Sequence, residues 1–325
     1  MSQLYLTLLI IIISLLIGLS YGIVSRKKTG ATEKLRMLAS QVQKRVIKYI
    51  IPLALIGTFW GLIIPGKTLF LLPFIGLLSH LIGGISASFV SSCFNHSDRQ
   101  KGSMFTCGAF TNLTSFGGLI AYFFYSEAGF GLLALFKLFE PFFYYGVGFP
   151  IAKLYSSNLK EDKVRAIFDW HLLVKDPLVL LPLGAIILGS LLNYANLERP
   201  IVFDIIVPAG IMISTSILLI TVGFNINIRA TPKYLQEALA ISAIKHLLTP
   251  VSLAIIGLIA GYHHLNGGLP FKLLIILGAM PVAFNSLIPP SLYGLDLDLA
   301  NACWIISTTL FLAVVLPVLY IGLVF

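Results

Sequence analysis

Charged side chains are scarce in this sequence. Only 11% of its 325 residues are Asp, Glu, Lys or Arg, whereas about a quarter of a typical soluble domain is charged. Hydrophobic residues make up 58% of the chain, and the mean hydropathy is +0.95. This balance excludes an ordinary soluble domain and predicts an all-α polytopic membrane protein. Transmembrane strands are excluded as well, because the apolar runs do not alternate and are too long for single strands.

Cysteine is also nearly absent, and the three cysteines, Cys93, Cys107 and Cys303, are scattered. Their spacing supports neither a disulfide framework nor a zinc site, so we expect packing residues and no metal or cofactor. The usual motifs of intramembrane enzymes are missing too, since there is no HExxH, no GxSxG and no pair of membrane aspartates. The sequence therefore does not favour an enzyme.

Long apolar runs are abundant, and ten of them are long enough to cross a membrane. About 20 helical residues cover a hydrocarbon core of roughly 30 Å. The runs lie near 3–24, 46–64, 69–90, 103–126, 130–155, 178–196, 201–224, 237–262, 271–293 and 299–325. The run at 178–196 is the weakest, because Pro182 and Asn193 interrupt it.

The net charge of +9 is explained by topology rather than by a nucleic-acid partner. Lys and Arg concentrate in alternate loops, with large groups at 26–48 and 153–175 and smaller ones at 99–101 and 229–233. The positive-inside rule places these segments in the cytoplasm and both termini outside. No positive charge precedes the first apolar run, which predicts a signal anchor in a multi-pass protein of the cytoplasmic membrane.

The charged segment 156–177 leaves five apolar runs on each side of it. We expect this segment to be a cytoplasmic linker between two halves, residues 1–155 and 178–325. A half with five spans ends on the side of the membrane opposite to its start, so a second copy of it would be inverted. Inverted repeats are common in secondary transporters. Weak sequence similarity between the two halves supports a repeat, because prolines lie at corresponding positions: Pro52 with Pro208, and Pro150 with Pro317.

The ninth run contains a helix breaker at a place where a spanning helix is normally continuous. Pro281 lies about ten residues into this run, roughly 15 Å deep at helical rise, and Asn285 and Ser286 follow within a turn. Backbone groups that a proline frees in lipid must find partners, so such a break survives only against protein or a watery cavity. We expect Asn285 and Ser286 to supply such partners.

The fourth run, GSMFTCGAFTNLTSFGGLIAYFF, has a matching interruption. Its Asn112 also falls near the midplane, among residues that weaken a helix or carry hydroxyls: Thr111, Thr114, Ser115, Gly117 and Gly118. Paired interruptions in corresponding segments are the best pointer in a sequence to a transport site. Two helices broken there would present half-helix N-termini with partial positive charge. The pattern therefore predicts a site for an organic anion such as a carboxylate, made by Thr111, Asn112, Thr114, Ser115, Gly117, Pro281, Asn285 and Ser286.

Ionisable residues at membrane depth are costly and indicate function. Lys137 and Glu140 share one helix face in the fifth run, Lys245 and His246 lie in the eighth, and His80 lies in the third. We interpret them as coupling or gating residues, with Glu140 and Lys245 as a pair that responds to protons. A structural ion pair between helices is the equally open alternative.

Two glycines in the second run, Gly57 and Gly61, are four residues apart. This spacing lets helices approach closely. It is compatible with a homodimer through this span, and equally with packing inside the chain.

One stretch near the C-terminus, AMPVAFNSLIPPSLYGLDLDLANACWIISTTLFLAVVLPVL at 279–319, resembles the ninth and tenth spans of the auxin efflux carrier family. The matching features of that family are these: Met280–Pro281, Asn285–Ser286, Tyr293–Asp296, Ala300 and Ala302, Ser307–Thr309 and Pro317. GAFTNLTSFGGL resembles the fourth span, although the family usually has a proline where Gly118 stands. KDPLVLLPLGAIILGSLLN resembles the start of the family's second half.

The resemblance implies a short, prokaryote-style carrier of ten spans, in which the fourth and ninth cross as broken helices. Spans one, two, six and seven would form a scaffold, and spans three to five and eight to ten a mobile transport unit. Members of the family export organic anions, among them auxin and dicarboxylates such as malate. A sodium-coupled bile-acid-type symporter and a sensor built on a transporter fold are the alternatives.

Overall fold

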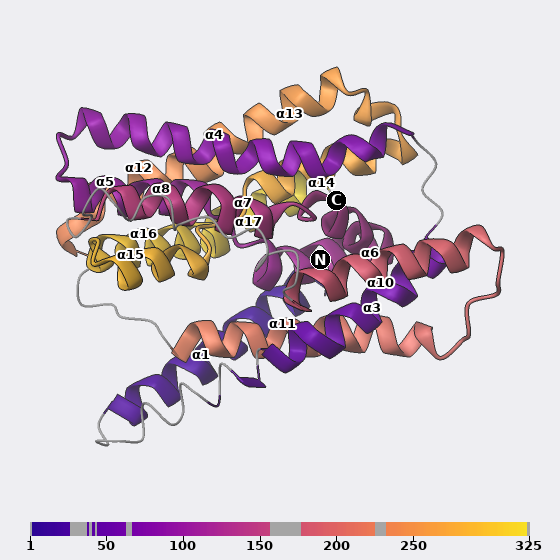
Figure 1. Cartoon of the computed structure of the whole chain (residues 1–325). Coiled ribbons are helices and arrows are strands. Elements are labelled where there is room, and N and C mark those ends of the chain that lie inside the picture. The colour runs from indigo at the N-terminus through magenta and orange to yellow at the C-terminus, as the bar shows by residue number, and fades with distance from the viewer. Residues whose placement is uncertain are drawn as a thin grey trace. The chain divides into compact units, whose positions relative to one another are not determined.

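The computed structural model describes residues 2–26, 38, 41–42, 44–62, 67–156, 177–224 and 232–323. This part of the chain is helical apart from turns and short extended segments (Figure 1). It contains no β-strand beyond one isolated bridge between two residues. The linker predicted at 156–177 lies outside the described residues, except for its two end positions.

Six helical stretches in the described ranges are long and apolar enough to cross a membrane: Tyr5–Val24, Leu69–Cys93, Leu113–Leu154, Phe203–Thr221, Pro232–Ile259 and Leu297–Leu323. Two apolar helices, Leu180–Tyr194 and Asn266–Gly278, are shorter. The protein is therefore an all-α membrane protein, as its composition predicts. The count of ten spans stays a prediction, because several of the predicted runs are short or interrupted in the structure.

The chain divides into two compact units. Unit 1 comprises Met1–Pro65, Thr114–Ala134 and Val174–Ile226, and unit 2 comprises the remaining segments, Gly66–Leu113, Leu135–Leu173 and Asn227–Phe325. Each unit draws on both sides of the charged segment 156–177. Residues far apart in the sequence therefore form each core.

Unit 1 is built from four main helices and part of a fifth. Their bounds, with those of one wide helical turn, are α1 (Ser2–Arg26), η1 (Val46–Ile50), α3 (Ile51–Gly61), α6 (Gly118–Phe136), α10 (Pro177–Tyr194) and α11 (Phe203–Phe224). α1 packs along α11, α11 along α3, and α3 along α10 (Figure 1). Within α6, the backbone kinks at Tyr125 and Ser126, close to the predicted boundary between the fourth and fifth runs.

Glycines permit the close contacts in unit 1. A Cβ on Gly18 of α1 would collide with the backbone of Ile220 on α11. A Cβ on Gly57 would meet the side chains of Phe203 and Val207, and one on Gly61 would meet Arg199. Gly57 and Gly61 thus pack inside this unit. A homodimer through the second span stays a prediction.

Unit 2 contains more and shorter elements. In its N-terminal half they are η2 (Lys67–Leu71), α4 (Leu72–Cys93), α5 (Asp98–Ala109), α7 (Glu140–Phe143), η4 (Tyr144–Gly148) and α8 (Phe149–Leu154). The later ones are α12 (Leu235–Ala243), η7 (Ile244–Leu248), α13 (Thr249–Ile259), η8 (Tyr262–His264), η9 (Asn266–Gly268), α14 (Leu269–Gly278), η10 (Phe284–Leu287), α15 (Ile288–Tyr293), α16 (Leu297–Leu310), η11 (Phe311–Val315) and α17 (Leu316–Leu323). α5 packs against α4, α8 and α16, and α12 packs against α16.

Five helical turns in the described residues are wider than an α-helix, and four of them are separated from a proline by a single residue. In η1, η4, η7 and η11, the residue after the turn donates its N–H to a carbonyl five residues earlier. The next residue in each case is a proline: Pro52, Pro150, Pro250 and Pro317. Proline has no N–H, and its ring clashes with the carbonyl four residues back. A wide turn relieves that clash without ending the helix.

Candidate functional site

Two helices of unit 2 stop in the middle of apolar sequence. α5 ends at Ala109, and Phe110 is extended with φ −90° and ψ 125°. α14 ends at Gly278, and the chain is extended again at Ala283, with φ −70° and ψ 146°. Pro281 lies within the second interruption, where its ring and missing N–H prevent a regular helix.

The two interruptions pair with each other as a short antiparallel bridge. The N–H of Asn112 donates to the carbonyl of Pro281 at 2.9 Å, and the N–H of Ala283 donates to the carbonyl of Phe110 at 3.1 Å. A backbone N–H or C=O group without a hydrogen-bond partner in hydrocarbon costs several kcal/mol. This mutual pairing is therefore what allows both helices to stop where they do.

The residues at the centre of the bridge are Thr111 and Val282. The N–H of Val282 donates to Oγ of Ser307 on α16 at 3.2 Å. The sequence predicts Asn285 and Ser286 as partners for the backbone here, but the hydroxyl that meets Val282 is that of Ser307. Ser286 is fully buried, whereas Asn285 is exposed at the start of the next helical segment.

A histidine meets the end of each interrupted helix. Nδ1 of His80 lies 2.9 Å from the carbonyl oxygen of Ala109, and Nδ1 of His246 lies 2.9 Å from that of Ala279. Because a carbonyl only accepts, each Nδ1 must carry a proton. Nε2 of His246 also faces a carbonyl, that of Ser307 at 3.1 Å. Both histidines therefore satisfy carbonyls that a helix end leaves without an intrahelical partner.

Lys245 brings a cation to the bridge. Its side chain is fully buried in η7, and its Nζ donates to Oγ1 of Thr111 at 2.8 Å. A Cβ on Gly83 would lie 3.6 Å from the same Nζ, which is an ordinary contact distance, so α4 borders the ammonium group at this glycine. A buried ammonium is costly, and it favours any anion that approaches it.

Glu140 is connected to the bridge through the hydroxyl of Tyr144. Its Oε2 lies 3.4 Å from Nζ of Lys137, and its Oε1 accepts a hydrogen bond from the Tyr144 hydroxyl at 2.8 Å. The same hydroxyl lies 3.3 Å from the carbonyl oxygen of Thr111. The predicted pair of Glu140 and Lys245 is thus linked indirectly, through Tyr144 and Thr111.

Tyr144 is a site residue that the sequence pattern does not indicate. Its ring stacks on Phe110, with centroids 4.1 Å apart, inside an aromatic core that includes Phe105 and Phe143. The only signal was its position four residues after Glu140, which places both on one helix face. Among 13 tyrosines and 23 phenylalanines, a buried aromatic residue is the ordinary expectation.

Three other predicted site residues, Thr114, Ser115 and Gly117, lie on the wide turn η3 (Leu113–Gly117). They belong to unit 1, where Ser115 is buried and Thr114 is half-buried. In unit 2 the structure brings Thr111, Asn112 and Pro281 together at the bridge, with the ionisable residues of the same unit around them.

Unit 1 has an ion-pair group of its own around Arg199. Nη1 of Arg199 lies 2.5 Å from Oε2 of Glu127, and Nη2 pairs with Asp204. Burial alone would lower the pKa of Arg199, but the hydrogen bonds to Glu127 and Asp204 raise that pKa above its ordinary value. This group ties α6 to the loop between α10 and α11.

In the part of the chain that the structure describes, no three His, Cys, Asp or Glu residues are grouped to hold a metal ion. No model of a known protein family matches the chain, and no curated protein matches it either.

Proposed function

We propose that this protein is a secondary transporter that moves a small organic anion across the cytoplasmic membrane by alternating access. The observation that carries the proposal is the bridge between Thr111 and Val282, where two interrupted helices meet inside apolar sequence. Non-helical backbone at membrane depth is tolerated only where it is buried in protein or lines a cavity. Discontinuous helices of this kind form the binding sites of many transporters.

The proposed architecture is ten spans in two inverted five-span repeats, with both termini outside. Corresponding features in the two halves support it. α5 and α14 are both interrupted, and His80 and His246 both meet the carbonyls at those interruptions. Wide turns precede Pro150 and Pro317 alike. Each of the two units contains segments from both halves of the sequence, which fits a division into a scaffold and a moving transport unit.

A carboxylate is the substrate class that the site favours. The Lys245 ammonium and the Thr111 hydroxyl lie at the bridge, and Asn112 is buried beside them. Directly after the bridge, η10 begins a new helical turn, and the partial positive charge on its first N–H groups favours an anion. The resemblance of residues 279–319 to the auxin efflux carrier family supports the same class, and we propose that the chain is a short member of that family.

Uptake by proteoliposomes tests this proposal. Purified protein is reconstituted, and the uptake of radiolabelled mono- and dicarboxylates is measured for the wild type, Asn112→Ala and Asn285→Ala. We expect both substitutions to abolish transport without lowering the yield of folded protein. Gln236→Ala serves as a matched control, because Gln236 is an exposed amide on α12. Uptake that persists in both site variants would show that the site is wrong.

A further inference from the structure

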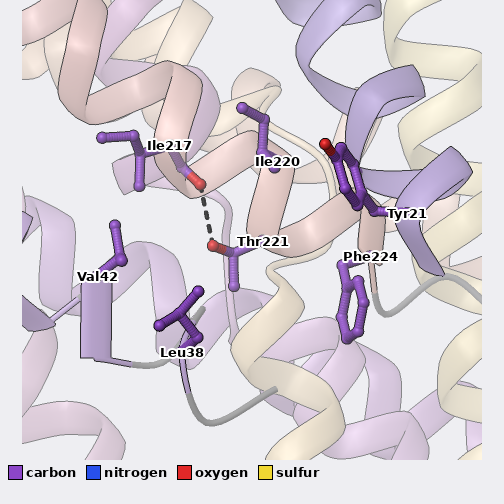
Figure 2. Close-up of a pocket in the computed structure, with 8 residues that line it drawn as sticks. Tyr21, Leu38, Val42, Ile217, Ile220, Thr221 and Phe224 are labelled. Atoms are coloured by element: carbon purple, nitrogen blue, oxygen red, sulfur yellow. Dashed lines mark hydrogen bonds between the residues drawn. The ribbon is translucent and has the colours of Figure 1, made fainter. Parts of the chain in front are cut away.

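Unit 1 contains a pocket of about 280 Å³ between α1 and α11, far in sequence from the bridge residues. Figure 2 labels seven of its eight lining residues, which are Tyr21, Leu38, Val42, Ile217, Ile220, Thr221 and Phe224, and the eighth is Gly18. The hydroxyl of Thr221 donates to the carbonyl of Ile217 within α11 at 3.0 Å (Figure 2). The walls offered by α11 are therefore mostly hydrocarbon.

The size and rim of the pocket limit what it can hold. Small-molecule pockets usually measure about 300–1,000 Å³, so this pocket lies at the small end of that range, with room for one section of an apolar chain. Its rim is open, because the side chains of Tyr21 and Leu38 are 61% and 57% exposed. A chain that enters the pocket can therefore continue beyond it.

Two lining residues of the pocket, Leu38 and Val42, come from a stretch of the sequence that is rich in Lys and Arg. Between Arg26 and Lys48 the sequence has eight Lys and Arg residues and a single acidic residue, Glu33. Lys44 and Arg45 are exposed and follow Val42, a pocket residue, by two and three positions. The turn η1, which carries Lys48, packs against α11. Clusters of basic residues immediately next to a membrane span attract anionic lipid head groups.

We propose that this pocket binds an acyl chain of an anionic glycerophospholipid whose phosphate contacts Lys44 and Arg45. The positive-inside rule predicts that this end of α1 lies at the cytoplasmic surface, where the phosphate of such a lipid would meet the basic segment. The pocket supplies the apolar contact, and the neighbouring cations supply the selectivity for a negative head group. The proposal does not depend on the transport function.

Native mass spectrometry tests the head-group selectivity. The full chain in detergent is mixed with equal amounts of phosphatidylglycerol and phosphatidylcholine that have the same acyl chains, and bound lipids are counted. Each cation near a membrane surface contributes about fivefold to binding, so two cations predict a preference for phosphatidylglycerol of about 25-fold. Lys44→Gln/Arg45→Gln should reduce this preference to near one. The control Lys101→Gln/Lys233→Gln removes two charges from unit 2 and should retain the preference.

A second variant tests the pocket itself. Val42→Trp fills the pocket from its partly exposed rim and should lower the binding of both lipids by about tenfold. The melting temperature of this variant without lipid shows whether it still folds. If Val42→Trp does not fold, Leu38→Trp at the more exposed rim position replaces it.

Four results would overturn the proposal. They are equal binding of the two lipids by the wild type, a preference that survives in Lys44→Gln/Arg45→Gln, undiminished binding in the folded pocket variant, and displacement of the lipid by inorganic phosphate alone. A pocket variant that dissociates a dimer and leaves lipid binding unchanged would assign the pocket to a contact between two copies of the chain.

Discussion

Thr111 is the residue on which the polar contacts of the site converge. Its backbone pairs with Val282, its Oγ1 accepts from Lys245 at 2.8 Å, and its carbonyl oxygen lies 3.3 Å from the Tyr144 hydroxyl. The three contacts reach it from α12–α13, from η4 and from the other interrupted helix. A change at this one side chain therefore alters the environment of a buried cation without touching the bridge itself.

Thr111→Val should destabilise the protein, because it removes the hydroxyl from a buried ammonium group. A buried group that loses its partner costs about 1–3 kcal/mol, more when it is charged. We expect the melting temperature in detergent, followed by intrinsic fluorescence, to fall by about 2–6 °C. Thr111→Ser keeps the hydroxyl and is the matched control. Equal melting temperatures for the two variants would show that the hydrogen bond to Lys245 contributes nothing to stability.

Lys245→Met should have the opposite effect on stability and should remove function. Replacing a buried charge by an apolar side chain of similar length is often neutral or stabilising. If Lys245 attracts the substrate anion, carboxylate uptake by proteoliposomes should fall by about tenfold or more while the melting temperature holds or rises. The double variant Thr111→Val/Lys245→Met should recover the stability lost in Thr111→Val, because the two changes act on one contact. Retained uptake in Lys245→Met would assign the lysine a structural role only.

At the scale of elements, the sequence predicts those features that depend on local chemistry. Pro281 marks an interruption because proline acts on its own turn, and the structure ends α14 three residues before it. Asn112 marks the other interruption less directly, since α5 ends at Ala109 without any proline. The pairing of the two interrupted segments with each other could not be predicted from the sequence. Its backbone hydrogen bonds join residues about 170 positions apart and depend on tertiary packing.

The close packing of α4 on α5 depends on a pair of glycines that the sequence analysis does not single out. A Cβ on Gly83 of α4 would collide with the carbonyl of Gly108 on α5, and a Cβ on Gly108 would collide with Ala87. The contact lies one residue before Ala109, where α5 ends. The separation of these two helices therefore influences the position of the bridge.

Gly83→Ala should destabilise the protein, because the new methyl group forces α4 and α5 apart. Overpacking of this kind costs about 1–3 kcal/mol. Gly184→Ala is the matched control, since Gly184 lies in the helix α10 and a methyl group added to it would meet no atom within 4 Å. Replacing an exposed helical glycine by alanine raises the free energy of unfolding by about 0.5–1 kcal/mol. Melting temperatures of the two variants should thus move in opposite directions, and a shared direction would contradict the packing argument.

At the scale of the whole molecule, apolar length and charge bias predict how the chain crosses the membrane, while packing decides which residues share a core. Composition alone is enough for an all-α membrane protein, and the described residues confirm that class. The count of spans is harder to predict, because a run such as 271–293 has the length of a span but is divided by Pro281. The assembly of each unit from segments on both sides of 156–177 is a tertiary property, which hydropathy does not contain.

Cysteine accessibility decides the topology, because the ten-span arrangement places neighbouring loops on defined sides. Asp98→Cys lies in a loop predicted to be cytoplasmic, and Glu198→Cys and His264→Cys lie in loops predicted to be outside; all three positions are exposed. The background variant is Cys93→Ser, since Cys93 is exposed whereas the other two cysteines are buried. A membrane-impermeant maleimide should label positions 198 and 264 in intact cells, and position 98 only in inverted vesicles. In this topology the chain crosses the membrane three times between positions 98 and 198. If both positions were labelled from the same side, the number of crossings between them would have to be even, and the inverted five-span repeats would be excluded.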